Sequence, residues 1–131
     1  MNLLTGSLGL SPDERLTAEA IALFHDVGRF EQYVRYSTFR DDISGNHAAL
    51  GVKVLKEEGV LVKVPEEERR AVYLAISLHN VFRVPSSIKD RDLISMRLIR
   101  DADKPDICRI YAEYFKQGVF WGRTKPTYLM I

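Results

Sequence analysis

The chain lacks several features that would assign it to a specialised class of protein. Only one of its 131 residues is cysteine, Cys108, which excludes an internal disulfide and is compatible with a reducing compartment. No apolar run approaches the roughly 18 residues that a membrane-spanning helix needs. The N-terminus also lacks the basic flank and long apolar core of a signal peptide. We therefore expect a cytoplasmic protein with no membrane partner.

The chain also has no large excess of positive or negative charge. The formal net charge is +1 and no block of lysine and arginine stands out, which argues against binding to extended nucleic acid but is compatible with a small phosphorylated ligand. Hydrophobic residues make up 46% and charged residues 28%, a usual globular mixture. We expect residues 1–131 to form one domain.

Helix signals, in contrast, recur along the chain. Residues 11–14, Ser-Pro-Asp-Glu, form a capping box with proline at the first helical position, and Gly59 is a helix stop. Pro105 predicts a kink or a restart in a late helix. The fold class predicted is all-α, with helices over residues 16–27, 29–36, 46–58, 65–80 and 90–114.

The segments outside these helices are predicted with less regular structure. Residues 37–45 are polar, and the pair Asp41–Asp42 within them is interpreted as part of a solvated loop, with the edge of a pocket as the alternative. Residues 60–64 are interpreted as an apolar connection rather than a strand, because no partner strand is evident. Residues 122–131 are predicted to be an irregular tail.

The three histidines of the chain share one property. His25, His47 and His79 each lie at one end of an apolar stripe, on three different predicted helices. A single histidine on an apolar face is more often a hydrogen-bonded core residue than a ligand. Three such histidines out of three favour their convergence on one site.

The residue after the first histidine strengthens this interpretation. Asp26 follows five apolar residues of a helix that reads as buried on all sides, where an unpaired carboxylate would cost several kcal/mol. Its cation could be Arg29 on the same helix, or a metal held by imidazoles and carboxylates. Asp101 and Asp103 supply further carboxylates, and periodicity alone does not choose between them.

These residues resemble a known family, the HD-domain metal-dependent phosphohydrolases. Residues 22–30, Ala-Leu-Phe-His-Asp-Val-Gly-Arg-Phe, are similar to the family's signature of apolar residues, His-Asp, an apolar residue, glycine and a basic residue. The segments 46–51, 75–80 and 101–104 follow in the order of the family, and the resemblance covers residues 16–114.

The resemblance implies an HD-domain helical bundle with a divalent metal ion, one or two, drawn from Mn, Fe, Co, Ni, Zn and Mg. It places the metal on His25, Asp26 and Asp103, with Asp101 as the second choice for the late carboxylate. His47 and His79 are similar to the additional histidines that hold a second metal or contact substrate in some branches of the family.

The implied activity is hydrolysis of a phosphate mono- or diester by metal-activated water, with a small phosphorylated molecule, favouring a nucleotide, as substrate. The catalytic residues implied are Asp26, Arg29 and Lys104, because the two basic residues match family positions that would contact phosphate. The chemistry relies on charge stabilisation at the phosphoryl oxygens.

Two departures from the family pattern leave alternatives open. The family's first metal histidine lies on a helix before the His-Asp pair, whereas no histidine precedes His25 here; residues 1–10 resemble the remnant of that helix, as if it were truncated. Pro105 replaces an aliphatic residue. The chain is therefore either an enzyme or a degenerate HD domain that serves as a non-catalytic nucleotide-binding, regulatory or oligomerisation module. A third possibility is that a homo-oligomer or an upstream segment completes the site.

Overall fold

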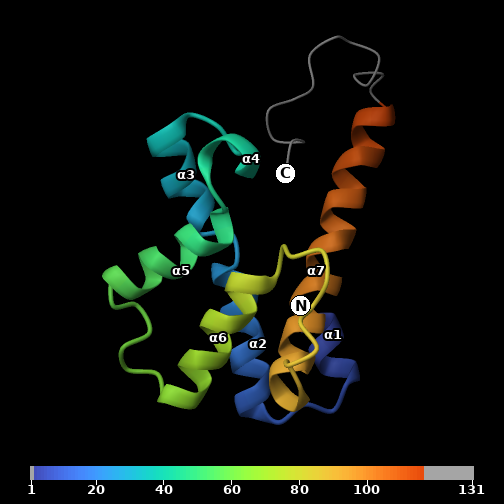
Figure 1. Cartoon of the computed structure of the whole chain (residues 1–131). Coiled ribbons are helices and arrows are strands. Elements are labelled where there is room, and N and C mark those ends of the chain that lie inside the picture. The colour runs from blue at the N-terminus through green and yellow to red at the C-terminus, as the bar shows by residue number, and fades with distance from the viewer. Residues whose placement is uncertain (1, 117–131) are drawn as a thin grey trace.

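The protein is built from helices throughout the part that the structure, a computed structural model, describes, which is residues 2–116 (Figure 1). The helices in chain order are α1 (Asn2–Ser7), α2 (Pro12–Phe24), α3 (Gly28–Tyr36), α4 (Asp41–Ser44), α5 (His47–Glu57), α6 (Glu66–Leu78) and α7 (Asp90–Lys116). No strand occurs within this range, and the all-α prediction is confirmed.

Local sequence explains where several helices begin. The capping box at the start of α2 is formed as predicted: the Glu14 backbone N–H donates to Ser11 Oγ at 3.2 Å, and the Ser11 N–H donates to Glu14 Oε2 at 2.8 Å. Asn46 caps α5 by accepting a hydrogen bond from the Ala48 N–H at 2.8 Å. This cap fixes the first turn of α5, which begins with His47.

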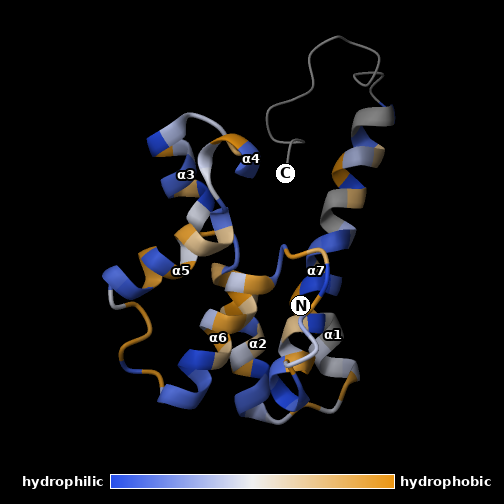
Figure 2. Ribbon diagram, viewed as in Figure 1, coloured by the Kyte–Doolittle hydropathy of each residue, from blue (hydrophilic) through white to orange (hydrophobic). Residues whose placement is uncertain are grey.

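The core lies where α2, α6 and the first half of α7 pack together, with α5 completing one side. Its buried side chains come from these helices and from the connection after α5: Ile21, Leu55, Leu61, Val72, Ala75, Ile76 and Ile99. Figure 1 shows α3 and α4 on the opposite side of α5 from the core, while the second half of α7 extends beyond the other helices. Figure 2 shows apolar residues concentrated where α2, α6 and α7 face one another.

Three details differ from the sequence-based expectations. Within the predicted loop 37–45, Asp41–Ser44 forms the short helix α4. Helix α7 continues through Pro105 without a second start. The α2 helix is not buried on all sides, since the side chains of Leu16 and Leu23 are 64% and 74% exposed. The run of five apolar residues near the end of this helix therefore predicted more burial than the structure has.

Other expectations are met or lie outside the described residues. Residues 60–64 form turns that connect α5 to α6, in agreement with the prediction. Of the described helices, none combines the length and the apolarity required to cross a membrane. The predicted irregular tail, 122–131, falls outside the described range.

The first turns of α3 and α5 approach each other unusually closely. A Cβ atom built on Gly28 would lie 2.0 Å from the His47 carbonyl oxygen and 2.4 Å from the Gly51 nitrogen, both backbone atoms. No side chain fits at this distance, so glycine at position 28 is required for the contact. The contact places the segment that contains His25 and Asp26 directly against the start of α5.

Replacing this glycine should therefore destabilise the fold. We expect Gly28→Ala to lower the free energy of unfolding by about 1–3 kcal/mol, the usual cost of overpacking, because backbone atoms must move apart. Urea denaturation would measure the change. The matched control is Gly6→Ala in α1, where no atom lies within 4 Å of the added Cβ and stability should be unchanged or slightly raised. Equal stability of the Gly28→Ala variant and the wild type would contradict the contact.

Candidate metal centre

Five candidate ligands come from four separate parts of the chain. His25 and Asp26 lie in the turn between α2 and α3, His47 is the first residue of α5, His79 caps the end of α6, and Asp103 lies in the middle of α7. Figure 1 shows that the end of α2, the start of α5 and the end of α6 meet beside α7. The fold thus brings together residues that span almost 80 positions of sequence, from 25 to 103.

The Asp26 carboxylate is at the middle of this cluster. Its Oδ1 lies 3.4 Å from His47 Nε2 and 3.8 Å from His79 Nε2, and its Oδ2 lies 3.5 Å from His25 Nε2. Asp103 Oδ1 lies 3.5 Å from the same His25 nitrogen. The two nitrogens His47 Nε2 and His79 Nε2 are 3.1 Å apart. All three imidazoles therefore direct Nε2 toward one point.

The opposite nitrogen of each imidazole is held by an acceptor. His25 Nδ1 lies 2.8 Å from the Ala22 carbonyl oxygen, His79 Nδ1 lies 2.7 Å from the Ile76 carbonyl oxygen, and His47 Nδ1 lies 2.8 Å from Asp41 Oδ2. Carbonyl and carboxylate oxygens only accept, so each Nδ1 must carry the proton that it donates. In the neutral imidazoles, Nε2 is then an unprotonated acceptor facing the centre of the cluster.

In the neutral imidazoles, lone pairs on three nitrogens face two carboxylates, an arrangement that favours a cation between them. Burial lowers the pKa of His79, so a proton on that buried imidazole is disfavoured. For Asp26, burial would raise the pKa, but the neighbouring His47, His25 and Arg29 outweigh burial and lower it to about 2. The carboxylate is therefore ionised at neutral pH.

His25 differs from His79 in its electrostatic surroundings. Burial alone would lower the pKa of His25, but the hydrogen bond with Asp103 and the negative charge of Asp26 outweigh burial and raise it. A cation on the Nε2 side of His25 is favoured by both carboxylates. Imidazole nitrogens and carboxylate oxygens are the usual ligands of divalent transition metals, and the ligand atoms of His25, Asp26 and His79 lie within 4.8 Å of one another.

Asp41, which the sequence predicts to lie with Asp42 in a solvated loop, instead contacts the histidine cluster through His47. Besides His47, its carboxylate accepts hydrogen bonds from Gln32 Nε2 at 2.8 Å and Asn80 Nδ2 at 3.3 Å, and it lies 3.4 Å from Arg29 Nη1. Its pKa is lowered, because the bonds from Gln32 and His47 outweigh the effect of burial. The loop 37–45 has no periodicity that could have distinguished Asp41 from its neighbour, although the fully buried Gln32 that it binds is an unusual core residue.

The two basic residues predicted to contact phosphate occupy different surroundings. The side chain of Arg29 is only 11% exposed, and its Nη1 donates to the Phe39 carbonyl oxygen at 2.8 Å and to Gln32 Oε1 at 3.2 Å. Lys104 is exposed, and its Nζ lies 3.7 Å from Asp101 Oδ1. Of the two late carboxylates, Asp103 thus faces His25, while Asp101 lies at the surface beside Lys104.

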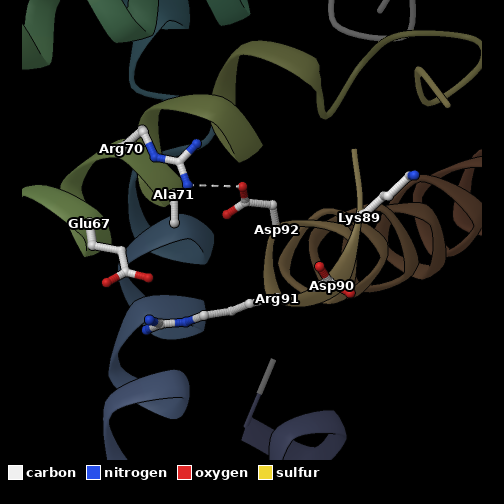
Figure 3. Close-up of a pocket in the computed structure, with 7 residues that line it drawn as sticks. All are labelled: Glu67, Arg70, Ala71, Lys89, Asp90, Arg91 and Asp92. Atoms are coloured by element: carbon white, nitrogen blue, oxygen red, sulfur yellow. Dashed lines mark hydrogen bonds and ion pairs between the residues drawn. The ribbon is translucent and has the colours of Figure 1, made fainter. Parts of the chain in front are cut away.

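A second cluster of charged residues lies at the other end of α6. This pocket is lined by residues at the starts of α6 and α7, and Figure 3 shows Arg70 directed toward Asp92, with a distance of 3.3 Å between Arg70 Nη2 and Asp92 Oδ2. Twelve positions of α6 separate Glu67 from His79, which corresponds to about 18 Å along a helix. The pocket is therefore remote from the histidine cluster.

Comparison with known families agrees with this geometry. The family model described as the HD domain matches residues 1–106, so the chain belongs to the HD domain family. Proteins of this family are in general hydrolases that bind divalent metals. No curated protein and no solved structure matches the chain.

The tautomers assigned above lead to a prediction for the metal-free protein. Long-range proton–nitrogen correlation spectra at mildly alkaline pH should show all three histidines with the proton on Nδ1. Asp41→Ala should convert His47 wholly or partly to the Nε2-protonated form, because the acceptor of the Nδ1 proton is lost. It should also lower the free energy of unfolding by about 1–3 kcal/mol, since buried Gln32 loses a partner.

The neighbouring residue provides the control for this experiment. Asp42 pairs with Arg40 at the surface, so Asp42→Ala should leave the tautomer of His47 and the stability nearly unchanged. An Nε2-protonated His47 in the wild-type protein would contradict the assignment.

Proposed function

We propose that this protein is a metal-dependent phosphohydrolase that cleaves a phosphate mono- or diester, with a nucleotide as the favoured substrate. The observation that carries the proposal is the set of three Nε2 atoms and two carboxylates directed at one point, with every Nδ1 proton already donated elsewhere. Family membership supports the same chemistry at the level of a metal-dependent hydrolase.

The two oxygens of Asp26 suggest how metals would be shared. Oδ1 faces the pair His47 and His79, whereas Oδ2 faces His25, which in turn faces Asp103. This division supports one ion held by His25, Asp26 and Asp103, and a second held by Asp26, His47 and His79. A carboxylate whose two oxygens face different ligand groups would be suited to help hold both ions.

When bound, divalent metals would supply Lewis-acid chemistry and a water nucleophile at neutral pH. Arg29 would act as a positioning residue rather than a phosphate ligand, because its guanidinium holds Asp41 and lies 3.7 Å from Asp26 Oδ1. Lys104 remains suited to a phosphoryl oxygen. Its exposed pair with Asp101 is of a type that contributes little to stability, so exchanging that carboxylate for phosphate would cost little.

The histidine missing from the start of the family pattern bears on this proposal. Without it, the described cluster still contains three imidazoles and two carboxylates, and both buried imidazoles, His47 and His79, belong to it. This donor set supports metal binding without the missing histidine. The competing interpretation is a non-catalytic nucleotide-binding or regulatory module. Metal analysis together with hydrolysis assays distinguishes it from an enzyme.

The test is elemental analysis of the purified protein before and after exposure to Mn²⁺, followed by hydrolysis assays on a panel of nucleotides. We expect near-stoichiometric metal in the wild type, its loss in Asp26→Ala together with hydrolysis, and reduced metal in Asp103→Ala. Asp101→Ala is the matched control and should retain its metal, because Asp101 lies at the surface beside Lys104.

Two outcomes would contradict the proposal in different ways. A wild-type protein that retains no metal would refute the metal centre itself. Retained metal with no hydrolysis of any phosphate ester on the panel would refute the enzyme and favour the non-catalytic module.

A further inference from the structure

The segment that follows His79 has an exposed aromatic residue. Phe82 is 89% exposed, the largest value among the exposed large hydrophobic residues of the described chain. Single exposed apolar side chains are common, so exposure alone identifies no site. Here, however, the ring lies three residues after an inward-facing histidine, in the connection between α6 and α7 that Figure 1 shows beside α7.

The backbone of this segment is held by one guanidinium group. Arg100 Nη1 donates to the carbonyl oxygens of His79, at 3.2 Å, and Val81, and Arg100 Nη2 donates to that of Phe82 at 3.3 Å. Arg100 precedes Asp103 by three positions on α7, so the two residues lie on neighbouring positions of one helix face. The segment is therefore fixed relative to two candidate ligands, His79 and Asp103.

A cation accompanies the exposed ring. The Arg83 guanidinium carbon lies 5.9 Å from the centre of the Phe82 ring. Within residues 2–116, no carboxylate lies within 4.0 Å of a nitrogen of Arg83, whereas Arg29 and Arg100 are both committed to internal hydrogen bonds. Arg83 is thus available to an anion from outside the protein.

We infer that residues 81–83 form a recognition arm for a nucleotide, in which Phe82 stacks on the base and Arg83 pairs with an anionic oxygen. Aromatic side chains stack on bases of any sequence, and a nearby guanidinium adds attraction for both the ring and the phosphate. The inference rests on the proposed function and specifies that the substrate carries an aromatic base.

The test separates recognition from hydrolysis by using a ligand that cannot be cleaved. We would measure binding of an adenosine phosphonate, in which a methylene group replaces the ester oxygen, to the Mn²⁺-treated protein by calorimetry. The corresponding ribose phosphonate, which lacks the base, is the matched ligand. The wild type should bind the adenosine compound more tightly than the ribose compound.

Substitutions then assign the roles of the two side chains. Phe82→Ala should weaken binding of the adenosine compound about tenfold, within the range measured when an aromatic ring is removed from beneath a base, and leave the ribose compound within about twofold. Phe82→Trp should restore the preference. Arg83→Gln should weaken both ligands by a similar factor, because the anion is common to them.

Phe30→Ala is the matched control variant, since Phe30 is also strongly exposed, at 76%, but lies on α3. It should bind both ligands as the wild type does, and metal content should be the same in all variants. The inference would be overturned if the wild type did not prefer the adenosine compound, or if Phe82→Ala bound it as tightly as the wild type. Selective binding of the adenosine compound without hydrolysis of any ester would instead refute the proposed enzyme and leave the arm in place.

Discussion

The structure depends on the way each histidine ring is oriented by its Nδ1 hydrogen bond. Two of the acceptors are carbonyl oxygens one turn earlier in the chain, Ala22 for His25 and Ile76 for His79, and the third is the Asp41 carboxylate for His47. These bonds leave three Nε2 atoms unprotonated around Asp26. The resulting concentration of lone pairs and negative charge would be unfavourable in a closed core, and a bound divalent cation would compensate it.

Helix packing provides the frame that keeps these rings together. The absence of a Cβ at Gly28 lets the backbone of α3 meet that of α5, which brings the His-Asp pair to the capped start of α5. On the other side, Arg100 ties the end of α6 to α7 through backbone carbonyl oxygens. The same helices that bury the apolar core thus determine the separations among the candidate ligands.

Much of the fold could be predicted from the sequence, because its signals are local. The capping box, the glycine stop after α5 and the apolar periodicity depend on residues within one or two turns, and they predicted the helices and the faces that carry the histidines. The role of Asp41 could not be predicted, since it depends on contacts with Gln32 on α3 and with Asn80 in the turn after α6. The burial of Arg29 was missed for the same reason: its partner Phe39 O lies ten residues away in an irregular segment.

The central claim is that the three Nε2 atoms are metal ligands while the three Nδ1 protons stay in place. The most direct measurement is a titration of the isotope-labelled protein with diamagnetic Zn²⁺, followed through the side-chain nitrogens of His25, His47 and His79. We expect all three Nε2 resonances to shift together as metal is added, while every Nδ1 remains protonated. A shift confined to one histidine, or the loss of an Nδ1 proton on metal binding, would contradict it.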